Sequence, residues 1–132
     1  MRPSPPSPNE SLETQLKESE RRFAQAFRYA AIGMALVLPE GRWLQVNDSL
    51  CAMLGYTESE LMALDFQDIT HPDDLADDLA LVGQLLSGER PSFHMEKRYI
   101  HRDGHIVHAQ LSASLVRDES GEPLYFISQV QD

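Results

Sequence analysis

The amino-acid sequence predicts an α+β fold, in which a five-stranded antiparallel sheet carries a helical insert on one face and follows an amphipathic helix. Three strand-like runs close the chain over residues 92–132, and two more occupy residues 32–38 and 42–47. The stretch between these groups has helical patterns and capping residues. Strands separated by a block of helices are typical of α+β domains, whose helices gather on one face of the sheet.

The N-terminal helix is predicted over residues 11–30, after a disordered tail of residues 1–10 that is rich in proline and serine. Its apolar and small residues recur at spacings of four and three, which indicates either a helix packed on its own domain or a self-associating seam. Both can hold at once. The seam comprises Leu12, Leu16, Ser19, Phe23, Ala26 and Ala30.

The two early strands open a domain core that is predicted over residues 31–132, and short helices follow them. Residues 48–54 read as a helix that ends at Gly55, because glycine readily adopts the left-handed conformation of a C-cap. Thr57-Glu58-Ser59-Glu60 is a capping box that begins a second helix.

A longer helix is predicted from Pro72 to Gly88, since proline suits the first helical position. The acidic pairs Asp73-Asp74 and Asp77-Asp78 are interpreted as partners of the helix dipole and as solvated charge on an exposed face. One apolar face is expected to carry Leu75, Leu79, Val82 and Leu86.

The three closing strands form a predicted meander. Asp103-Gly104 favours a two-residue hairpin turn, which would pair Arg102 with His105 and keep the nearby histidines from opposing one another. Apolar side chains alternate with polar ones along the middle strand, so one of its faces is covered. These inward residues are Val107, Ala109, Leu111, Ala113 and Leu115.

The last strand is apolar on both faces, which is typical of a strand covered on both sides. Phe126 and Val130 face one way, and Tyr125 and Ile127 face the other. The second face gives the N-terminal helix a place to dock or dimerise. The expected dimer interface therefore comprises Leu12, Leu16, Phe23, Ala26, Ala30, Tyr125 and Ile127.

Composition excludes several classes of protein. The net charge is −10 over 132 residues, which argues against binding to nucleic acid or to an anionic membrane surface. No apolar run approaches the roughly 20 residues of a transmembrane helix. The single cysteine, Cys51, fits a reducing compartment, and we expect a cytoplasmic domain whose parent protein can still be membrane-anchored.

The order of these elements, with the residues at their joints, strongly resembles the PAS sensor-domain family from about Glu18 to Asp132. The stretches that carry the resemblance are ESERRFAQAFRYAAIGMALV, GRWLQVNDSLCAMLGYTESEL, FQDITHPDD, EKRYIHRDGHIV and LVRDESGEPLYFISQVQD. The resemblance implies a cavity between sheet and helices that can hold a small ligand. It also implies that Asp132 matches the start of a junction to an output domain, so this chain is expected to be a module of a longer protein.

The apolar pattern offers a set of candidate residues for that cavity, although the same residue types also fill ordinary cores. The candidates are Met34, Leu36, Val46, Leu50, Met53, Leu54, Phe66, Leu79, Val82, Val107, Ala109, Leu111, Phe126 and Val130.

The sequence leaves the cofactor unknown, but a covalent flavin, a haem and a metal are not expected. The flavin photoreceptor branch of the family has a reactive cysteine in an Asn-Cys-Arg-Phe motif, where this chain has FQDITHPDD. That branch also places amides on inward strand positions, where we expect Ala109 and Val130. Haem-binding members carry an axial histidine in or near the long helix, which here has only His71 at its boundary. The remaining histidines read as a polar surface rather than a zinc site.

Three functions remain open at this point. The first is a sensory and dimerising PAS module, with the output domain missing from this chain; the family implies a histidine kinase or an enzyme that makes or hydrolyses cyclic-di-GMP. The second is a structural protein–protein interaction module with a filled core and no ligand. The third, catalysis within the chain, lacks a phosphate-binding loop or a recognisable catalytic triad. Partners are therefore expected to be a second copy, the output domain and, if the cavity is occupied, a small ligand.

Overall fold

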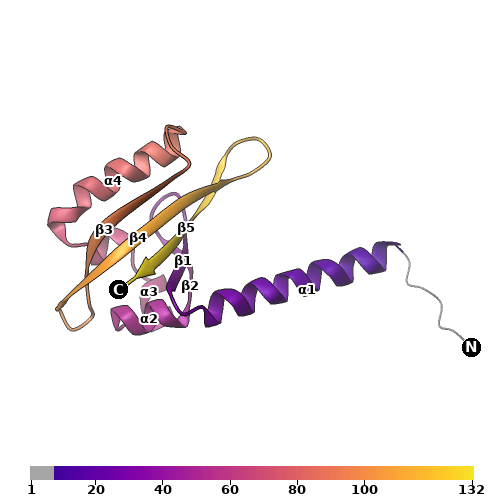
Figure 1. The fold of residues 1–132 in the computed structure, drawn as a ribbon, viewed down its shortest axis with the longest axis horizontal. Helices are drawn as coiled ribbons and strands as arrows, with labels where there is room; N and C mark the ends of the chain where they lie inside the picture. The colour runs from indigo at the N-terminus through magenta and orange to yellow at the C-terminus, as the bar shows by residue number, and fades with distance from the viewer. Residues whose placement is uncertain (1–7) are drawn as a thin grey trace, which may run out of the picture.

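The computed structural model describes residues 8–132, with side chains from Ser11 onward (Figure 1). Residues 1–7 of the predicted tail lie outside this range. The elements, in chain order, are α1 (Pro8–Tyr29), β1 (Gly33–Val37), β2 (Trp43–Val46), α2 (Asp48–Leu54), α3 (Glu58–Met62), the 3-10 helix η1 (Phe66–Ile69), α4 (Pro72–Ser87), β3 (Ser92–Ile100), β4 (Ile106–Arg117) and β5 (Pro123–Gln131). Within residues 8–132, no helix is both long enough and apolar enough to cross a bilayer.

The strands form the predicted five-stranded antiparallel sheet in the order β2-β1-β5-β4-β3. The first and last strands of the chain are thus neighbours: Gly33 of β1 pairs with Val130 of β5, which pairs with Leu111 of β4 on its other side. The helices between β2 and β3 lie on one face of this sheet, and the buried core fills the space between.

The predicted caps of the helices between β2 and β3 are present in the structure. Asn47 caps α2 by accepting a hydrogen bond from the backbone N–H of Leu50, and Gly55 ends it with a φ of 79°. Thr57 completes its capping box with Glu60. At α4, the imidazole of His71 caps the helix through the N–H of Asp73. Local chemistry therefore fixes these boundaries.

The N-terminal helix is longer than predicted and does not lie against the sheet. It begins at Pro8, within the predicted tail, and projects from the body of the domain (Figure 1). Leu12, Leu16 and Phe23 are more than half exposed. Only the last turn is anchored, where Phe27 is 7% exposed and stacks on Phe23. The expectation that this helix covers the second face of its own sheet is therefore wrong.

Strand β1 has the opposite parity to the one predicted. Its core-facing residues are Ala35 and Val37, whereas Leu36 pairs with Ile127 on the other face and Met34 pairs with Gln129. The run from residue 32 to 38 is apolar at almost every position, so alternation carried no information about which residues point inward. Met34 and Leu36 are accordingly not part of the core between sheet and helices.

The β3–β4 hairpin also differs from the prediction. Ile100 pairs with Ile106, and residues 101–105 form a five-residue loop closed by a 2.8 Å bond from the N–H of His101 to the carbonyl of His105. A two-residue turn of this type needs positive φ at both positions, but glycines alone adopt positive φ in the described chain. The loop brings His101 and His105 into a stack with ring centroids 4.2 Å apart, so these histidines do oppose one another.

Gly104 holds the left-handed position of this loop with a φ of 97°. We expect Gly104→Val to lower the free energy of unfolding by about 1–3 kcal/mol, because a β-branched residue resists that conformation. Gly83 of α4 provides the control, since its position has open space around it and no positive φ. Gly83→Val should leave stability almost unchanged. Equal urea midpoints for both variants would contradict the loop geometry.

Candidate functional site

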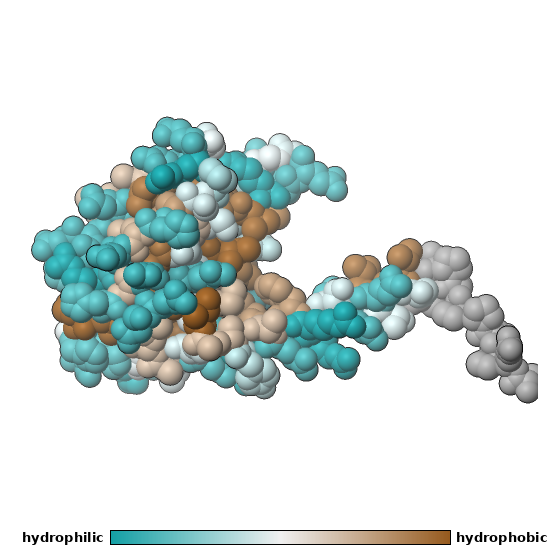
Figure 2. Space-filling view, in the orientation of Figure 1, coloured by the Kyte–Doolittle hydropathy of each residue, from teal (hydrophilic) through white to brown (hydrophobic). Residues whose placement is uncertain are grey.

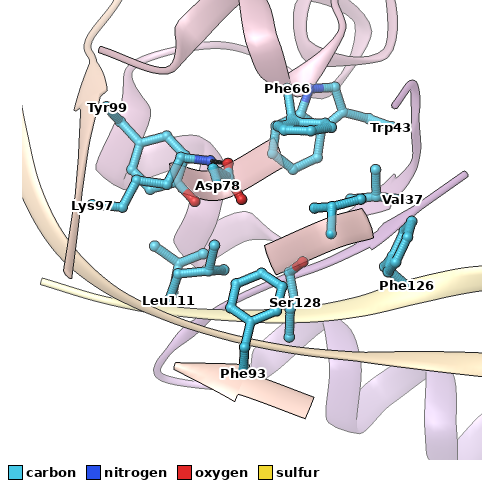
Figure 3. Close-up of a pocket in the computed structure, with 13 residues that line it drawn as sticks. Val37, Trp43, Phe66, Asp78, Phe93, Lys97, Tyr99, Leu111, Phe126 and Ser128 are labelled. Carbon is cyan, nitrogen blue, oxygen red and sulfur yellow. Dashed lines mark hydrogen bonds and ion pairs between the residues drawn. The ribbon is translucent and has the colours of Figure 1, made fainter. Parts of the chain in front are cut away.

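A small cavity lies between the sheet and the helices, and Figure 3 shows its walls. Its volume is about 30 Å³. Aromatic side chains from three strands, β2, β3 and β5, and from η1 line it. The lining residues are Val37, Trp43, Phe66, Asp78, Val82, Phe93, Lys97, Tyr99, Leu111, Ala113, Phe126, Ser128 and Val130.

The structure brings part of the predicted lining together and leaves part elsewhere. Five of the candidates line the cavity, namely Phe66, Val82, Leu111, Phe126 and Val130. Others pack in the same core away from it, namely Val46, Leu50, Met53, Leu54, Val107 and Ala109. Leu79 is 39% exposed, and Met34 and Leu36 lie on the other face of the sheet, so these three predictions are wrong.

Helix α4 presents a different face to the core from the one predicted. Leu85 is buried at 1% exposure. Asp78 lies seven residues earlier, on the same face of the helix, and is equally buried. The expectation that Asp77 and Asp78 both lie on a solvated surface is therefore wrong for Asp78. Asp77 is exposed, as expected.

The buried carboxylate of Asp78 pairs with the ammonium group of Lys97. The Nζ–Oδ2 distance is 2.5 Å, and each side chain is 2% exposed. The same Nζ lies 4.6 Å from the ring centroid of Tyr99 and 5.1 Å from that of Phe66, so the cation also contacts two aromatic faces. Figure 3 shows the pair at one end of the cavity.

Burial sets the electrostatics of this end of the cavity. Desolvation lowers the pKa of Lys97, while the Asp78 carboxylate opposes that shift. Burial likewise raises the pKa of the Tyr99 hydroxyl, with the charge of Asp78 adding to the effect. Tyr99 therefore stays neutral, and the ion pair is the charged group of the cavity wall.

The first turn of α4 fixes this arrangement against the edge strand β3. Asp74 accepts hydrogen bonds from the backbone N–H of Arg98 at 2.8 Å and from its guanidinium at 2.7 and 3.0 Å. The backbone N–H of His71 donates to the carbonyl of Arg98. These bonds to Arg98 lower the pKa of Asp74 to about 2. Asp74 lies one turn before Asp78 on the same helix face. Its bonds to Arg98 therefore hold α4 in the position that places Asp78 beside Lys97.

Sequence patterns did contain a signal for the missed pair. Lys97 is separated from Phe93 and from Tyr99 by an even number of positions, so all three side chains share the inward face of β3. Asp78 precedes Val82 by four residues and Leu85 by seven, which places it on the buried stripe of α4. An inward lysine and an inward aspartate in the same domain predict a buried ion pair.

Cavity size limits what the site can hold. A volume of about 30 Å³ matches the space of roughly one water molecule. Pockets for drug-sized ligands usually measure about 300–1,000 Å³. The indole N–H of Trp43, which also lines the cavity, is the buried side-chain nitrogen that lacks a hydrogen-bond partner within residues 8–132.

The matched family agrees with this architecture. The PAS fold family matches residues 44–130, which is more than half of the chain and includes every residue that lines the cavity except Val37 and Trp43. The chain belongs to the PAS fold family. The resemblance that the sequence showed is thereby confirmed.

Two curated relatives contain a segment similar to this PAS domain. The probable diguanylate cyclase DgcE of Escherichia coli (strain K12) is 53% identical over 117 residues, which cover 89% of this chain and 11% of that protein. The sensor histidine kinase TmoS of Ectopseudomonas mendocina is 26% identical over 117 residues, covering 89% of this chain and 12% of its own. The chain thus spans about a tenth of the length of these relatives.

Solved PAS structures have the same fold. A PAS domain of a protein from Colwellia psychrerythraea superposes with a TM-score of 0.79 at 18% identity, covering 86% of this chain and 96% of its own. A domain of a sensory box sensor histidine kinase/response regulator from Geobacter sulfurreducens gives 0.74 at 26% identity, covering 89% and 96%. The chain is therefore a sensory PAS module of the kind found in bacterial signalling proteins, and its fold is regulatory rather than catalytic.

Proposed function

We propose that this PAS module perceives a signal, homodimerises through α1, and relays the signal to an output domain outside this chain. The observation that carries the proposal is the placement of α1 and β5. Helix α1 leads directly into β1, β1 pairs with β5, and β5 ends at Gln131. A change in how these two strands pack would act on both ends of the domain at once.

The junction between α1 and β1 is held by polar side chains of the α2 start. The amide nitrogen of Asn47 donates to the carbonyls of Phe27 and Ile32 at 2.9 and 3.0 Å. The hydroxyl of Ser49 donates to the carbonyl of Ala30 at 2.6 Å. The base of α1 is therefore tied to the domain core, which lets the direction of the helix follow the core.

The exposed stripe of α1 supports dimerisation. Leu12, Leu16 and Phe23 are 58%, 62% and 53% exposed on a helix that projects into solvent. Figure 2 shows hydrophobic residues on this projecting arm. Burying such side chains against a second copy contributes about 1.5–3 kcal/mol each. Tyr125 and Ile127, half-buried on the uncovered sheet face, extend the proposed interface.

Dimerisation gives the first test. We expect Leu16→Glu to weaken self-association at least tenfold in sedimentation equilibrium, because it places a charge in the proposed seam. Gln25→Glu is the matched control, since it adds the same charge on the opposite side of the exposed helix. Thermal unfolding of both variants should match the parent chain. A parent chain that stays monomeric at high concentration, or equal association of both variants, would refute the seam.

The relatives support the kind of output domain. DgcE is named as a probable diguanylate cyclase and TmoS as a sensor histidine kinase. We propose that catalysis resides in such a domain of the parent protein, and that this module works in the cytoplasm. The greater identity to DgcE favours a cyclic-di-GMP enzyme over a kinase.

A ligand-free interaction module is the second candidate, and the cavity volume of about 30 Å³ favours it. Flavin and haem are far larger than this space, so we propose that neither is resident. Native mass spectrometry and absorbance of the purified chain, with thermal shifts across a metabolite panel, would test it. A co-purified small molecule or a reproducible stabilising metabolite would support ligand sensing instead.

A further inference from the structure

We propose that His101, Asp103 and His105 in the β3–β4 loop form a binding site for a divalent transition-metal ion of the zinc, nickel and copper class. These residues belong to neither the cavity nor the proposed dimer seam. Each offers one ligand atom, and the three atoms lie within 4.8 Å of one another. Two imidazoles and one carboxylate are a ligand set that such ions accept, whereas magnesium prefers oxygen ligands alone.

The three side chains converge on one oxygen. Oδ1 of Asp103 lies 3.2 Å from Nδ1 of His101 and 2.5 Å from Nδ1 of His105. The backbone N–H of Asp103 donates to Nδ1 of His101 at 3.1 Å, so this nitrogen is unprotonated, and an ion that binds it would displace that hydrogen bond. The backbone N–H of His105 donates to the carboxylate and orients it. A bound ion would replace the proton that His105 and Asp103 share, and that proton would leave to solvent.

Contacts with α2 and α3 hold the loop in place. The N–H of Arg102 donates to the carbonyl of Leu54 at 3.0 Å, and its guanidinium lies 3.2 Å from the carboxylate of Glu60. The His101 ring packs over Gly55, where an added Cβ would lie 2.4 Å from Nε2. The same Cβ would lie 2.9 Å from Nδ1, so this contact restricts the ring as a whole. The 3.2 Å separation from Oδ1 of Asp103 identifies Nδ1 as the nitrogen of His101 that faces the cluster.

Solvent completes the coordination. The side chains of Asp103 and His105 are 62% and 57% exposed, so an ion in this position would keep water on its open side. Zinc–nitrogen bonds of about 2.0–2.1 Å require ligand atoms roughly 3.0–3.4 Å apart in tetrahedral or octahedral geometry. Nδ1 of His101 and Oδ1 of Asp103 already have this separation. The exposed ring of His105 stacks on that of His101, so it must rotate out of the stack to direct its nitrogen at the same ion.

The test is calorimetric titration of the untagged 132-residue chain with zinc chloride and with nickel chloride. We expect one-to-one binding that His105→Gln weakens at least tenfold and that His108→Gln leaves unchanged. His108 is the matched control because it is an exposed histidine of β4, outside the loop. Excess magnesium should not compete. Equal affinity of the two variants, or no saturable binding by the parent, would overturn the site.

Imidazole NMR supplies an independent readout that does not depend on stability. Stoichiometric zinc should shift the ring nitrogen signals of His101 and His105 and leave those of His94 and His108 in place. Shifts spread equally over all four rings would mean diffuse surface binding and would overturn the proposal. Far-UV circular dichroism of His105→Gln should match the parent, since the side chain is exposed and lies outside the strands.

Discussion

Replacing Asp78 with alanine is expected to lower the free energy of unfolding by about 3–5 kcal/mol, one of the largest single effects in this domain. The carboxylate and the ammonium of Lys97 are both almost fully buried, at 2% side-chain exposure. Removing the carboxylate leaves a buried cation without its counter-ion. The rings of Tyr99 and Phe66 would offset only part of that cost, because a cation–π contact is worth roughly 0.5–2 kcal/mol.

Urea unfolding at neutral pH, followed by circular dichroism, measures this effect. Asp77→Ala is the matched control: it removes the same charge from the adjacent, exposed position and should change stability by less than about 0.5 kcal/mol. The double variant Asp78→Leu with Lys97→Met should recover most of the loss, since two apolar side chains can replace a buried pair. If Asp78→Ala is no more harmful than Asp77→Ala, the buried pair does not form.

The pair also indicates how the cavity could respond to its surroundings. It joins α4 to β3, and one turn away Asp74 joins the same two elements through Arg98. A group that enters the cavity must either form hydrogen bonds with the Asp78–Lys97 pair or displace it. The ion pair therefore favours a small polar molecule over an apolar one. Because the pair joins α4 to β3, α4 is the helix that we expect to shift when such a molecule binds.

Sequence reasoning succeeded where the determinant is local. A C-cap at Gly55, a capping box at Thr57 and a proline at the first position of α4 each act within one turn of the chain. Such contacts are readable from short motifs because the partners are three or four residues apart. The five-stranded antiparallel sheet and the family followed from the succession of these elements.

Errors arose where the determinant is not local. The parity of β1 depends on its neighbours in the sheet, because an apolar run offers both faces to the core. The hairpin register depends on which residue of the turn can adopt positive φ, and Asp103 does not. The burial of Asp78 depends on Lys97, which lies 19 residues away in the sequence. Each of these features depends on contacts with another part of the structure, which the residue pattern of a single segment does not reveal.

The second large effect is expected at Asn47, where alanine should lower the free energy of unfolding by about 3–5 kcal/mol. The side chain is 1% exposed. Its Oδ1 accepts from the N–H groups of Met34 and Leu50 at 2.9 and 3.0 Å, and its Nδ2 donates to the carbonyls of Phe27 and Ile32. Alanine would remove the cap of α2 and leave these backbone groups without their partner.

Asn47→Asp separates the two halves of this network. Aspartate keeps an acceptor for Met34 and Leu50, but it sets a carboxylate against the carbonyls of Phe27 and Ile32. Hydrogen exchange should therefore show fast amides at the base of α1 in this variant, while the amides of α2 remain protected. Ser49→Ala, which removes the single bond to Ala30, should give a smaller change of the same kind. Equal protection at the base of α1 in the parent chain, Asn47→Asp and Ser49→Ala would mean that the direction of the helix does not depend on Asn47. That result would contradict the proposed coupling between α1 and the domain core.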